Sequence, residues 1–296
     1  MYYNENTVLY FNGHVQKANE AHVDLYTQTL HYGYGVFEGI RSYNTGQGPR
    51  IFKAKEHYER LIRSCELMHI PFRYSVEEMT DITYEVLERN NFTEAYIRPL
   101  VLCSPNMSLT GCKESMLMIA AWEWSSYLGE KLLRLYISSI CRPHPRSVRV
   151  EAKACGHYVN SILAVNEAKQ KGYDEALLLD HEGFLAEGPG ANLFFEKNGK
   201  LFTPALGNIL PGITRTTVME LCEDLGFAWE EGKYPPEDLY EADSAFYCGT
   251  GAEIVGIESV DGKTMGKDWN DSIGKKIQKA YKRIVTDQSL QSLRVA

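Results

Sequence analysis

Lys153, near the middle of this 296-residue chain, is a lysine whose surroundings could support chemistry. It closes a strand-like run over residues 149–152, and the small residues Ala154 and Gly156 follow before a helical pattern begins. A primary amine held at a strand edge, with room beside it, can form a Schiff base with a flat cofactor such as pyridoxal phosphate. Taken alone, the stretch favours an ordinary surface lysine, so the other motifs must decide whether this amine is reactive.

A glycine-rich aromatic stretch lies upstream. If residues 36–43 form a strand, Phe37, Gly39 and Arg41 lie on one face, because side chains alternate along a strand. That face could line a pocket for an anionic ligand. The alternative is an ordinary strand in which Arg41 reaches solvent.

A Tyr-x-Arg pair forms a second candidate for anion binding. Tyr96 and Arg98 are two residues apart in a strand-like run, so they point the same way. A phenol beside a guanidinium suits a carboxylate. A structural ion pair is the alternative for Arg98.

Two backbone segments in the second half could bind an anion such as a phosphate. A helix is expected to begin near Pro211, and the amides of Ile213 and Thr214 at its N-terminus form an anion site. After a strand over residues 243–248, exposed amides and the hydroxyl of Thr250 could hold a second anion. Glu187 lies between these segments and Lys153, in a glycine-rich kink.

Helical patterns must hold these motifs in place. Apolar spacing predicts an amphipathic helix over residues 54–69, and a capping box beginning at Ser75 predicts another that runs to about residue 90. A third helix is expected over residues 157–171, with Ile162, Val165 and Ala168 facing inward.

Composition limits the class of protein. A hydrophobic fraction of 44% and a charged fraction of 24% are typical of soluble globular proteins. The net charge is −8 without a basic run, so the footprint of a nucleic-acid-binding protein is absent. No apolar run is long enough to span a membrane, and the N-terminus does not look like a signal peptide. Seven scattered cysteines without a C-x-x-C motif indicate reduced thiols in the cytoplasm and no metal site.

Taken together, these segments resemble the class IV aminotransferases, which are pyridoxal-phosphate enzymes of fold type IV, and most closely the bacterial branched-chain amino acid aminotransferases. The likeness runs from about residue 8 to about residue 285 with the family's order and spacing. Each motif is weak alone, and the ordered set is specific. It is carried by residues 31–33 with 36–41, 96–99, 152–154, 187–188 with 190 and 192–194, 210–215, and 249–250 with 252–253.

The resemblance implies an α/β (α+β) fold of two domains. The small α/β domain would cover residues 1–121, an interdomain loop 122–132, and a larger pseudo-barrel domain with flanking helices 133–296. The implied reaction is transamination between L-leucine, L-isoleucine or L-valine and 2-oxoglutarate, with pyridoxal phosphate as cofactor and with a homodimer as the minimal unit.

For the cofactor, the family implies that Lys153 forms the Schiff base and moves the proton during transamination. Glu187 would face the pyridine nitrogen and keep it protonated, and Tyr158 would bond the ring's 3-oxygen. The phosphate would be held by Arg60, Ile213, Thr214 and Thr250.

For the substrate, the family implies that Tyr96 and the amides of Gly251 and Ala252 bind the α-carboxylate. Arg98 would bind the side-chain carboxylate of glutamate. The apolar wall would comprise Phe37, Trp124 and Tyr127, and the residues expected to reach in from a second subunit are Tyr32, Met107 and Leu109.

The chain also departs from the family pattern. Ala191 replaces a usual glutamate and Gly251 a usual alanine, while Cys155 and His157 replace a more usual glycine and asparagine beside the lysine. These changes bear on substrate range more than on the cofactor. A D-amino-acid aminotransferase or a 4-amino-4-deoxychorismate lyase is the alternative within the family, and a cofactor-free binding protein is the alternative outside it.

Overall fold

The computed structural model describes residues 2–124 and 131–287, which form two compact units. The first unit contains residues 2–124 together with Ala152–His157, and the second contains residues 131–151 and 158–287. The domain limits expected from the sequence remain a prediction. The expected limits place residues 152–157 in the second domain, whereas in the structure these residues pack with the first unit.

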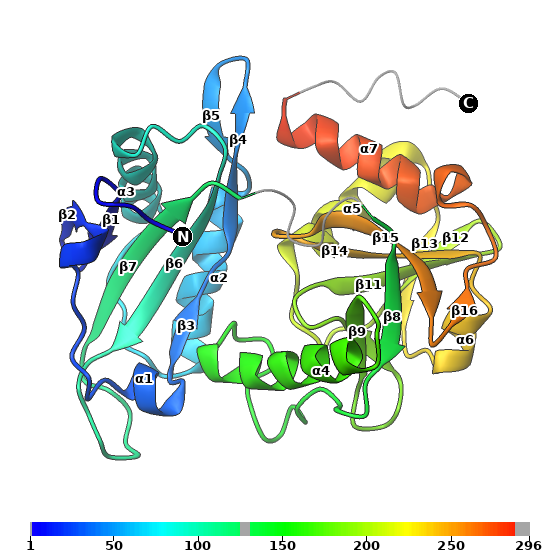
Figure 1. Cartoon of the computed structure of the whole chain (residues 1–296), viewed down its shortest axis with the longest axis horizontal. Coiled ribbons are helices and arrows are strands. Elements are labelled where there is room, and N and C mark those ends of the chain that lie inside the picture. The colour runs from blue at the N-terminus through cyan, green and yellow to red at the C-terminus, as the bar shows by residue number, and fades with distance from the viewer. Residues whose placement is uncertain (1, 125–130, 288–296) are drawn as a thin grey trace. The chain divides into compact units, whose positions relative to one another are not determined.

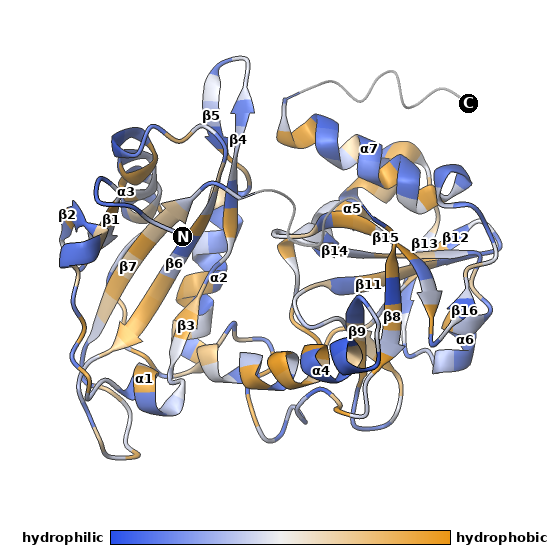
Figure 2. Cartoon of the chain, in the orientation of Figure 1, coloured by the Kyte–Doolittle hydropathy of each residue, from blue (hydrophilic) through white to orange (hydrophobic). Residues whose placement is uncertain are grey.

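The first unit is built on a seven-stranded antiparallel sheet with the order β2-β1-β7-β6-β4-β5, and β3 also pairs with β6 (Figure 1). Its long central strands, β6 and β7, are strongly hydrophobic (Figure 2). The strands are β1 (Val8–Phe11), β2 (His14–Lys17), β3 (Gly35–Phe37), β4 (Ile40–Thr45), β5 (Gly48–Ile51), β6 (Ala95–Cys103) and β7 (Ser115–Trp122).

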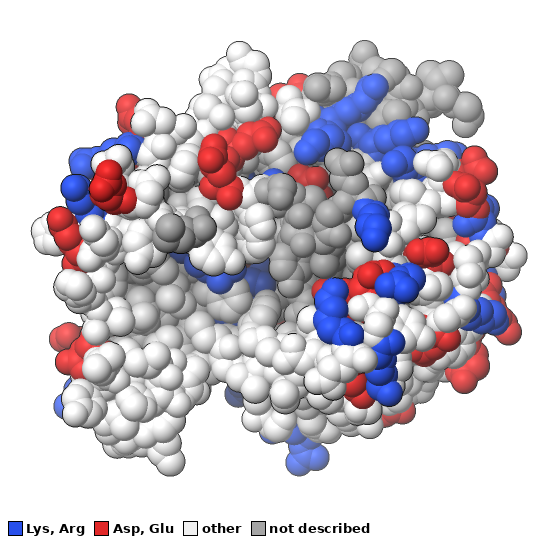
Figure 3. Space-filling model, in the orientation of Figure 1, with Lys and Arg blue, Asp and Glu red and all other residues white. Residues whose placement is uncertain are grey.

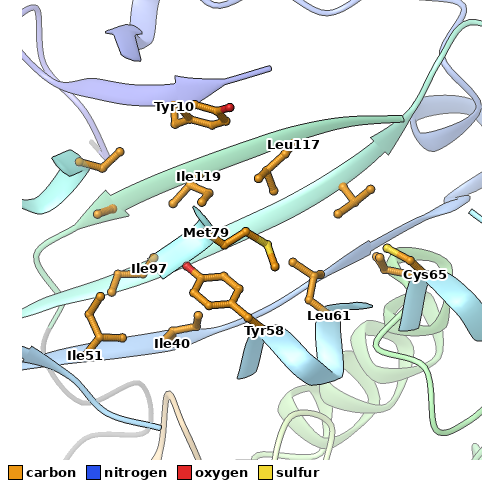
Figure 4. Close-up of a cluster of buried hydrophobic side chains, with 14 of the residues drawn as sticks. Tyr10, Ile40, Ile51, Tyr58, Leu61, Cys65, Met79, Ile97, Leu117 and Ile119 are labelled. Carbon is orange, nitrogen blue, oxygen red and sulfur yellow. The ribbon is translucent and has the colours of Figure 1, made fainter. Parts of the chain in front are cut away.

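Two helices cover one face of this sheet. They are α2 (Ala54–Leu67) and α3 (Val76–Arg89), and the short α1 (Gln28–Tyr32) lies at the end of β6. The predicted capping box is present, because Ser75 and Glu78 exchange side-chain and backbone hydrogen bonds. Figure 4 shows Tyr58 and Leu61 of α2 packed against Ile97 and Ile119 of the sheet. The opposite face of β6 and β7 is therefore left for other side chains, among them Tyr96 and Arg98.

The second unit is built on a nine-stranded mixed sheet with the order β10-β9-β8-β15-β14-β11-β12-β13. An additional pairing between β10 and β11 closes part of this sheet into a ring. The strands are β8 (Leu133–Ile137), β9 (Glu175–Leu179), β10 (Leu185–Glu187), β11 (Asn192–Lys197), β12 (Lys200–Pro204), β13 (Trp229–Gly232), β14 (Ser244–Gly249), β15 (Glu253–Val260) and β16 (Lys263–Thr264).

The helices of the second unit are α4 (Tyr158–Gln170), α5 (Ile213–Leu225), α6 (Pro236–Tyr240) and α7 (Ile273–Val285). Short 3-10 turns lie at Ala18–Glu20 and Cys155–His157 in the first unit and at Trp269–Asp271 in the second. The expectation that Ile162 of α4 faces inward is wrong. This helix packs on β8 and β9 through Ser161, Ala164 and Ala168, which leaves Ile162 exposed. Apolar residues colour much of α4 in Figure 2.

These elements confirm the predicted mixed α/β class, and the ring of strands in the second unit matches the expected pseudo-barrel with flanking helices. None of the helices in the described part of the chain combines the length and the apolar character that crossing a bilayer would require.

Candidate functional site

The segment that carries Lys153 is hydrogen-bonded along β3 of the first unit. The Lys153 carbonyl accepts from the Phe37 amide at 3.0 Å, and the Gly156 amide donates to the Gly33 carbonyl at 3.0 Å. The Lys153 amide in turn donates to the Ser64 hydroxyl at 3.1 Å. The lysine backbone is therefore fixed on both sides, by a strand and by helix α2.

The lysine side chain lies beside an aromatic ring that also contacts an arginine. The Nζ atom of Lys153 is 5.1 Å from the centroid of the Phe37 ring, and the guanidinium carbon of Arg98 is 4.6 Å from the same centroid. Lys153 is half-buried. An amine and a guanidinium are thus brought to one ring, although they are 55 residues apart in the sequence.

Arg98 is surrounded by aromatic side chains and has no acidic partner among the described residues. Its guanidinium lies 5.5 Å from the Tyr96 ring and 5.9 Å from the Trp122 ring, and Nη2 donates to the Tyr96 hydroxyl at 3.4 Å. Across residues 2–124 and 131–287, no carboxylate pairs with Arg98, and its buried Nε has no acceptor. The structural ion pair considered from the sequence is therefore absent there, and the guanidinium can receive a carboxylate.

Gly39 makes room for the Tyr96 hydroxyl. A β-carbon added at Gly39 would lie 2.0 Å from the Tyr96 hydroxyl oxygen, so a larger residue would displace the phenol. The pocket face predicted for residues 36–43 thus exists in part. The segment is not one strand, however, because β3 ends at Phe37 and β4 begins at Ile40.

Arg41 does not reach solvent. Its side chain is buried, its Nη2 donates to the Trp124 carbonyl at 3.1 Å, and its guanidinium lies over the Tyr43 ring. The hydrogen bond holds Trp124 near Tyr96, whose ring centroid is 4.8 Å from that of Trp124.

An apolar cavity of about 370 Å³ adjoins this aromatic group within the first unit. It is lined by Tyr2, Tyr3, Val8, Leu9, Arg98, Trp122 and Trp124, together with Thr7 and three alanines. A cavity of this size, mostly apolar with one arginine, has the composition of a small-molecule pocket.

A buried ion cluster fixes Arg60, the residue expected to hold a phosphate. Glu38 is fully buried and accepts from Arg60 Nε at 2.6 Å, from Arg60 Nη2 at 2.8 Å and from His57 Nδ1 at 2.8 Å. Burial would raise the pKa of the Glu38 carboxyl, but the Arg60 charge and His57 outweigh it and hold that pKa well below its usual range. Burial lowers the pKa of His57, against the opposing effect of Glu38.

Cys155, one of the departures beside the lysine, brings no charge to the site at neutral pH. Burial raises the pKa of its thiol to about 11, although the Arg98 charge acts in the opposite direction. The thiol therefore stays protonated, and this substitution does not alter the charge balance around Lys153.

In the second unit, Glu187 is a buried carboxylate at the end of β10. Its Oε1 lies 2.9 Å from Nε of Arg142, its Oε2 accepts from Asn192 Nδ2 at 3.1 Å, and the Leu210 amide donates to both oxygens at 3.1 and 3.2 Å. A buried carboxylate needs such partners to remain charged. Glu187 is therefore held as an anion in a fixed orientation.

The N-terminus of α5 lies next to this carboxylate. The Leu210 carbonyl accepts from Asn192 Nδ2 at 3.1 Å, and a β-carbon at Gly212 would lie 1.9 Å from Asn192 Oδ1. Gly212 caps α5 without a side-chain hydrogen bond, so the first amides of this 13-residue helix are available to an anion.

A second backbone turn lies close by in the same unit. Residues 250–252 connect β14 to β15, and a β-carbon at Gly249 would lie 3.0 Å from the Gly190 carbonyl. The kink itself is closed by the Gly188 amide, which donates to the Ala191 carbonyl at 2.8 Å. The Ala191 departure therefore leaves this turn intact.

The predicted site residues thus fall into two groups. Those in the first unit are Tyr32, Phe37, Arg60, Tyr96, Arg98, Trp124 and Lys153, and those in the second are Tyr158, Glu187, Ile213, Thr214, Thr250, Gly251 and Ala252. Tyr127 lies outside the described residues. Within the same limits, no three His, Cys, Asp or Glu side chains gather to hold a metal ion.

Sequence reasoning missed several residues of these groups, namely Glu38, His57, Trp122, Arg142 and Asn192. Except for Asn192, whose partner Glu187 is 5 residues away, their partners are distant in the sequence. Glu38 and Arg60 are 22 residues apart, and no local pattern signals such a pair. One signal in the sequence could have indicated two of these residues. Glu38 and Arg142 are charged residues within otherwise apolar or turn segments.

We expect Glu38→Gln to destabilise the protein by about 3–5 kcal/mol at pH 7, because it leaves Arg60 without its buried counter-ion. The folded-state pKa of Glu38 lies below its ordinary value of 4.5, so the ion pair stabilises fully above that pH and is lost as the pH falls. Urea unfolding at pH 7 and below pH 4 should therefore show a difference between wild type and variant that shrinks in acid.

Glu66→Gln is the matched control, because Glu66 pairs with Arg63 at 3.4 Å on the exposed surface of the same helix. Such a pair contributes at most about 1 kcal/mol. An effect of Glu38→Gln no larger than that of the control would contradict the role given to the cluster.

Known proteins resemble this chain over nearly its whole length. A model of the family described as amino-transferase class IV matches residues 35–260. A branched-chain-amino-acid aminotransferase of Pseudomonas aeruginosa is 40% identical over 289 residues, which cover 95% of this chain and 94% of that protein.

Solved structures agree with these matches. The branched-chain aminotransferase of Thermoproteus uzoniensis with norvaline has a TM-score of 0.92 at 38% identity and covers 97% of both chains. The T.th. branched-chain amino acid aminotransferase complexed with N-(5′-phosphopyridoxyl)-L-glutamate has a TM-score of 0.92 at 36% identity, and the match covers 97% of this chain and 96% of that one. These likenesses confirm the predicted fold type, and the protein belongs to the class IV aminotransferases.

Proposed function

We propose that the chain is a pyridoxal-phosphate-dependent transaminase that moves an amino group between L-leucine, L-isoleucine or L-valine and 2-oxoglutarate. The names of the similar proteins support this substrate class. The solved relative with norvaline supports an aliphatic substrate, and the one with a phosphopyridoxyl-glutamate supports an acidic substrate.

The observation that carries the proposal is Arg98, a guanidinium without a carboxylate partner among the described residues, held against Phe37, Tyr96 and Trp122. An aliphatic side chain needs apolar surface, and the side chain of glutamate needs a cation. Since Phe37 also contacts Lys153, both requirements are met close to the amine. One site can therefore accept both kinds of substrate.

The residues of the chain fit pyridoxal phosphate as the cofactor. Glu187 is a fixed buried carboxylate of the kind that retains a proton on a pyridine nitrogen. The uncapped N-terminus of α5, with Ile213 and Thr214, has the chemistry of a phosphate site, and Thr250 adds a hydroxyl. Tyr158 would bond the 3-oxygen, and Arg60, whose orientation Glu38 fixes, would add positive charge at the phosphate.

The bound cofactor supplies an electron sink for the negative charge that forms at the substrate Cα. Lys153 would take the proton from the substrate Cα and deliver it to the C4′ position of the cofactor, since an amine at this position can act as base and as acid. Tyr96 and the amides of Gly251 and Ala252 orient the α-carboxylate. Arg98 binds the side-chain carboxylate of glutamate, and Phe37 with Trp124 exclude water from an aliphatic side chain.

The proposed unit is a homodimer, because the first unit exposes an apolar patch that a second copy would cover. The patch comprises Leu25, Tyr26, Leu30, Tyr32, Met107 and Leu109, and the Tyr32 hydroxyl ties its two segments by donating to the Met107 carbonyl at 3.1 Å. The surface around α1 carries few charged residues (Figure 3). A contiguous patch of this kind marks an interaction surface. The seven free cysteines support a cytoplasmic location.

We expect Arg98→Met to lower kcat/KM for glutamate and 2-oxoglutarate by about ten- to a hundred-fold, while leucine changes little. A lost charge-assisted contact costs about 1.5–3 kcal/mol, and methionine keeps the apolar contact with Phe37. Kinetics of each half-reaction, with one substrate at a time, measure these values of kcat/KM.

Arg73→Met is the control, since Arg73 also lies over an aromatic ring, that of Tyr74, but is exposed and outside the proposed site. Equal losses for leucine and glutamate in Arg98→Met would show that Arg98 does not read the side-chain carboxylate.

The double variant Leu30→Glu, Leu109→Glu should dissociate the dimer, because it places charges in the apolar patch. Light scattering should give the wild type at twice the 33.6 kDa chain mass and the variant at the mass of one chain. Leu206→Glu, at an exposed leucine of the second unit, should leave the mass unchanged. A double variant that remains dimeric would place the interface elsewhere.

A further inference from the structure

Arg142 is a buried arginine that the proposed reaction does not use. It lies between β8 and α4 in the second unit, and its side chain is only 7% exposed, as is that of Glu187. The Nε atom of Arg142 lies 2.9 Å from Oε1 of Glu187. Burying an arginine costs several kcal/mol unless its charge is balanced, so this pair calls for a functional account.

The backbone and the far end of Arg142 are anchored as well. Its amide donates to the Leu179 carbonyl at 2.8 Å, and its Nη1 donates to Asn160 Oδ1 at 3.3 Å. Asn160 lies in the first turn of α4, which begins at Tyr158, and its Nδ2 donates to the Cys141 carbonyl at 2.8 Å. Arg142 therefore links Glu187 to the helix turn that carries Tyr158.

Two other groups of the second unit donate hydrogen bonds to Glu187. Asn192 Nδ2 and the Leu210 amide are neutral donors. Tyr247 is fully buried, and burial together with the charges of Glu175 and Glu187 raises the pKa of its phenol well above the ordinary value. Tyr247 therefore stays neutral and donates to the Ala176 carbonyl at 2.8 Å. The neutral donors fix the orientation of the Glu187 carboxylate, whereas the positive charge of Arg142 stabilises its negative charge.

We propose that Arg142 is a positioning residue that keeps Glu187 ionised, so that the proton shared with the pyridine nitrogen of the cofactor stays on the nitrogen. This inference rests on the proposed function. A guanidinium stays charged at any pH that a protein tolerates, so its field always opposes protonation of the neighbouring carboxylate. Without Arg142, the shared proton moves toward Glu187, and the cofactor ring withdraws electrons less strongly.

The chain offers a matched control for the loss of a cation beside a buried carboxylate. Glu196 on β11 is buried, and Nζ of Lys267 lies 2.5 Å from its Oε1. Glu196 also accepts from the Ser244 hydroxyl at 3.0 Å and from the Ile273 amide at 2.8 Å. Lys267→Met therefore makes the same chemical change in the same unit, at a carboxylate with no part in the proposed reaction.

The test compares Arg142→Met, Arg142→Lys and Lys267→Met in the holoenzyme, with thermal unfolding as a check of the fold. We expect Arg142→Met to lower kcat ten-fold or more while KM for leucine changes less than about three-fold, and to weaken pyridoxal phosphate binding, measured by fluorescence, about ten-fold. Arg142→Lys restores the charge and should recover kcat to within about five-fold of wild type. Lys267→Met should lose stability but keep kcat and cofactor affinity.

A folded Arg142→Met variant that behaves like Lys267→Met would overturn the proposal. If Arg142→Met does not fold, the kcat of Arg142→Lys alone tests the proposal. Near-normal kcat in that variant supports the role of the charge, and a folded lysine variant with a loss of ten-fold or more refutes it. Failure of the proposed function is distinguishable, because the unmutated protein would then bind no pyridoxal phosphate or leave leucine unchanged.

Discussion

The backbone pairing that holds Lys153 along β3 is the constraint on which the lysine group depends. The Phe37 amide and the Lys153 carbonyl form one of its hydrogen bonds, and Gly33 with Gly156 form another. At Gly33 the φ angle is +64°, and an added β-carbon would lie 2.7 Å from the Gly156 Cα, so only glycine permits this approach. The lysine is thereby placed beside the ring that also contacts Arg98.

In the second unit, the corresponding constraint is the set of contacts that holds the buried Glu187 carboxylate. The pairing of β10 with β11 turns the chain sharply after Glu187 and brings Asn192 opposite it. Asn192 then bonds both Glu187 and the carbonyl that precedes α5, so one side chain sets the carboxylate and the helix N-terminus together. In each unit one buried carboxylate is paired with an arginine, Glu38 with Arg60 and Glu187 with Arg142.

The sequence predicted what depends on local pattern and on family likeness. The capping box at Ser75, the fold class and the class IV family are confirmed. The inward orientation of Ile162 was wrong, because apolar spacing does not reveal that α4 packs through small residues and exposes its larger ones. The strand expected over residues 36–43 is interrupted at Glu38 and Gly39, where the buried Glu38 side chain is hydrogen-bonded to Arg60. Long-range ion pairs of this kind are set by the fold, so residue spacing cannot predict them. The individual roles given to the site residues remain predictions.

The proposed reaction requires that Lys153 holds pyridoxal phosphate and acts on L-aliphatic amino acids. The most direct test is the visible absorbance of the protein loaded with pyridoxal phosphate, before and after addition of L-leucine, with Lys153→Ala and D-alanine as controls. We expect a yellow protein that loses its colour with L-leucine and keeps it with D-alanine, while Lys153→Ala shows no such change. A yellow protein that L-leucine leaves unchanged, and that D-alanine bleaches, would contradict it.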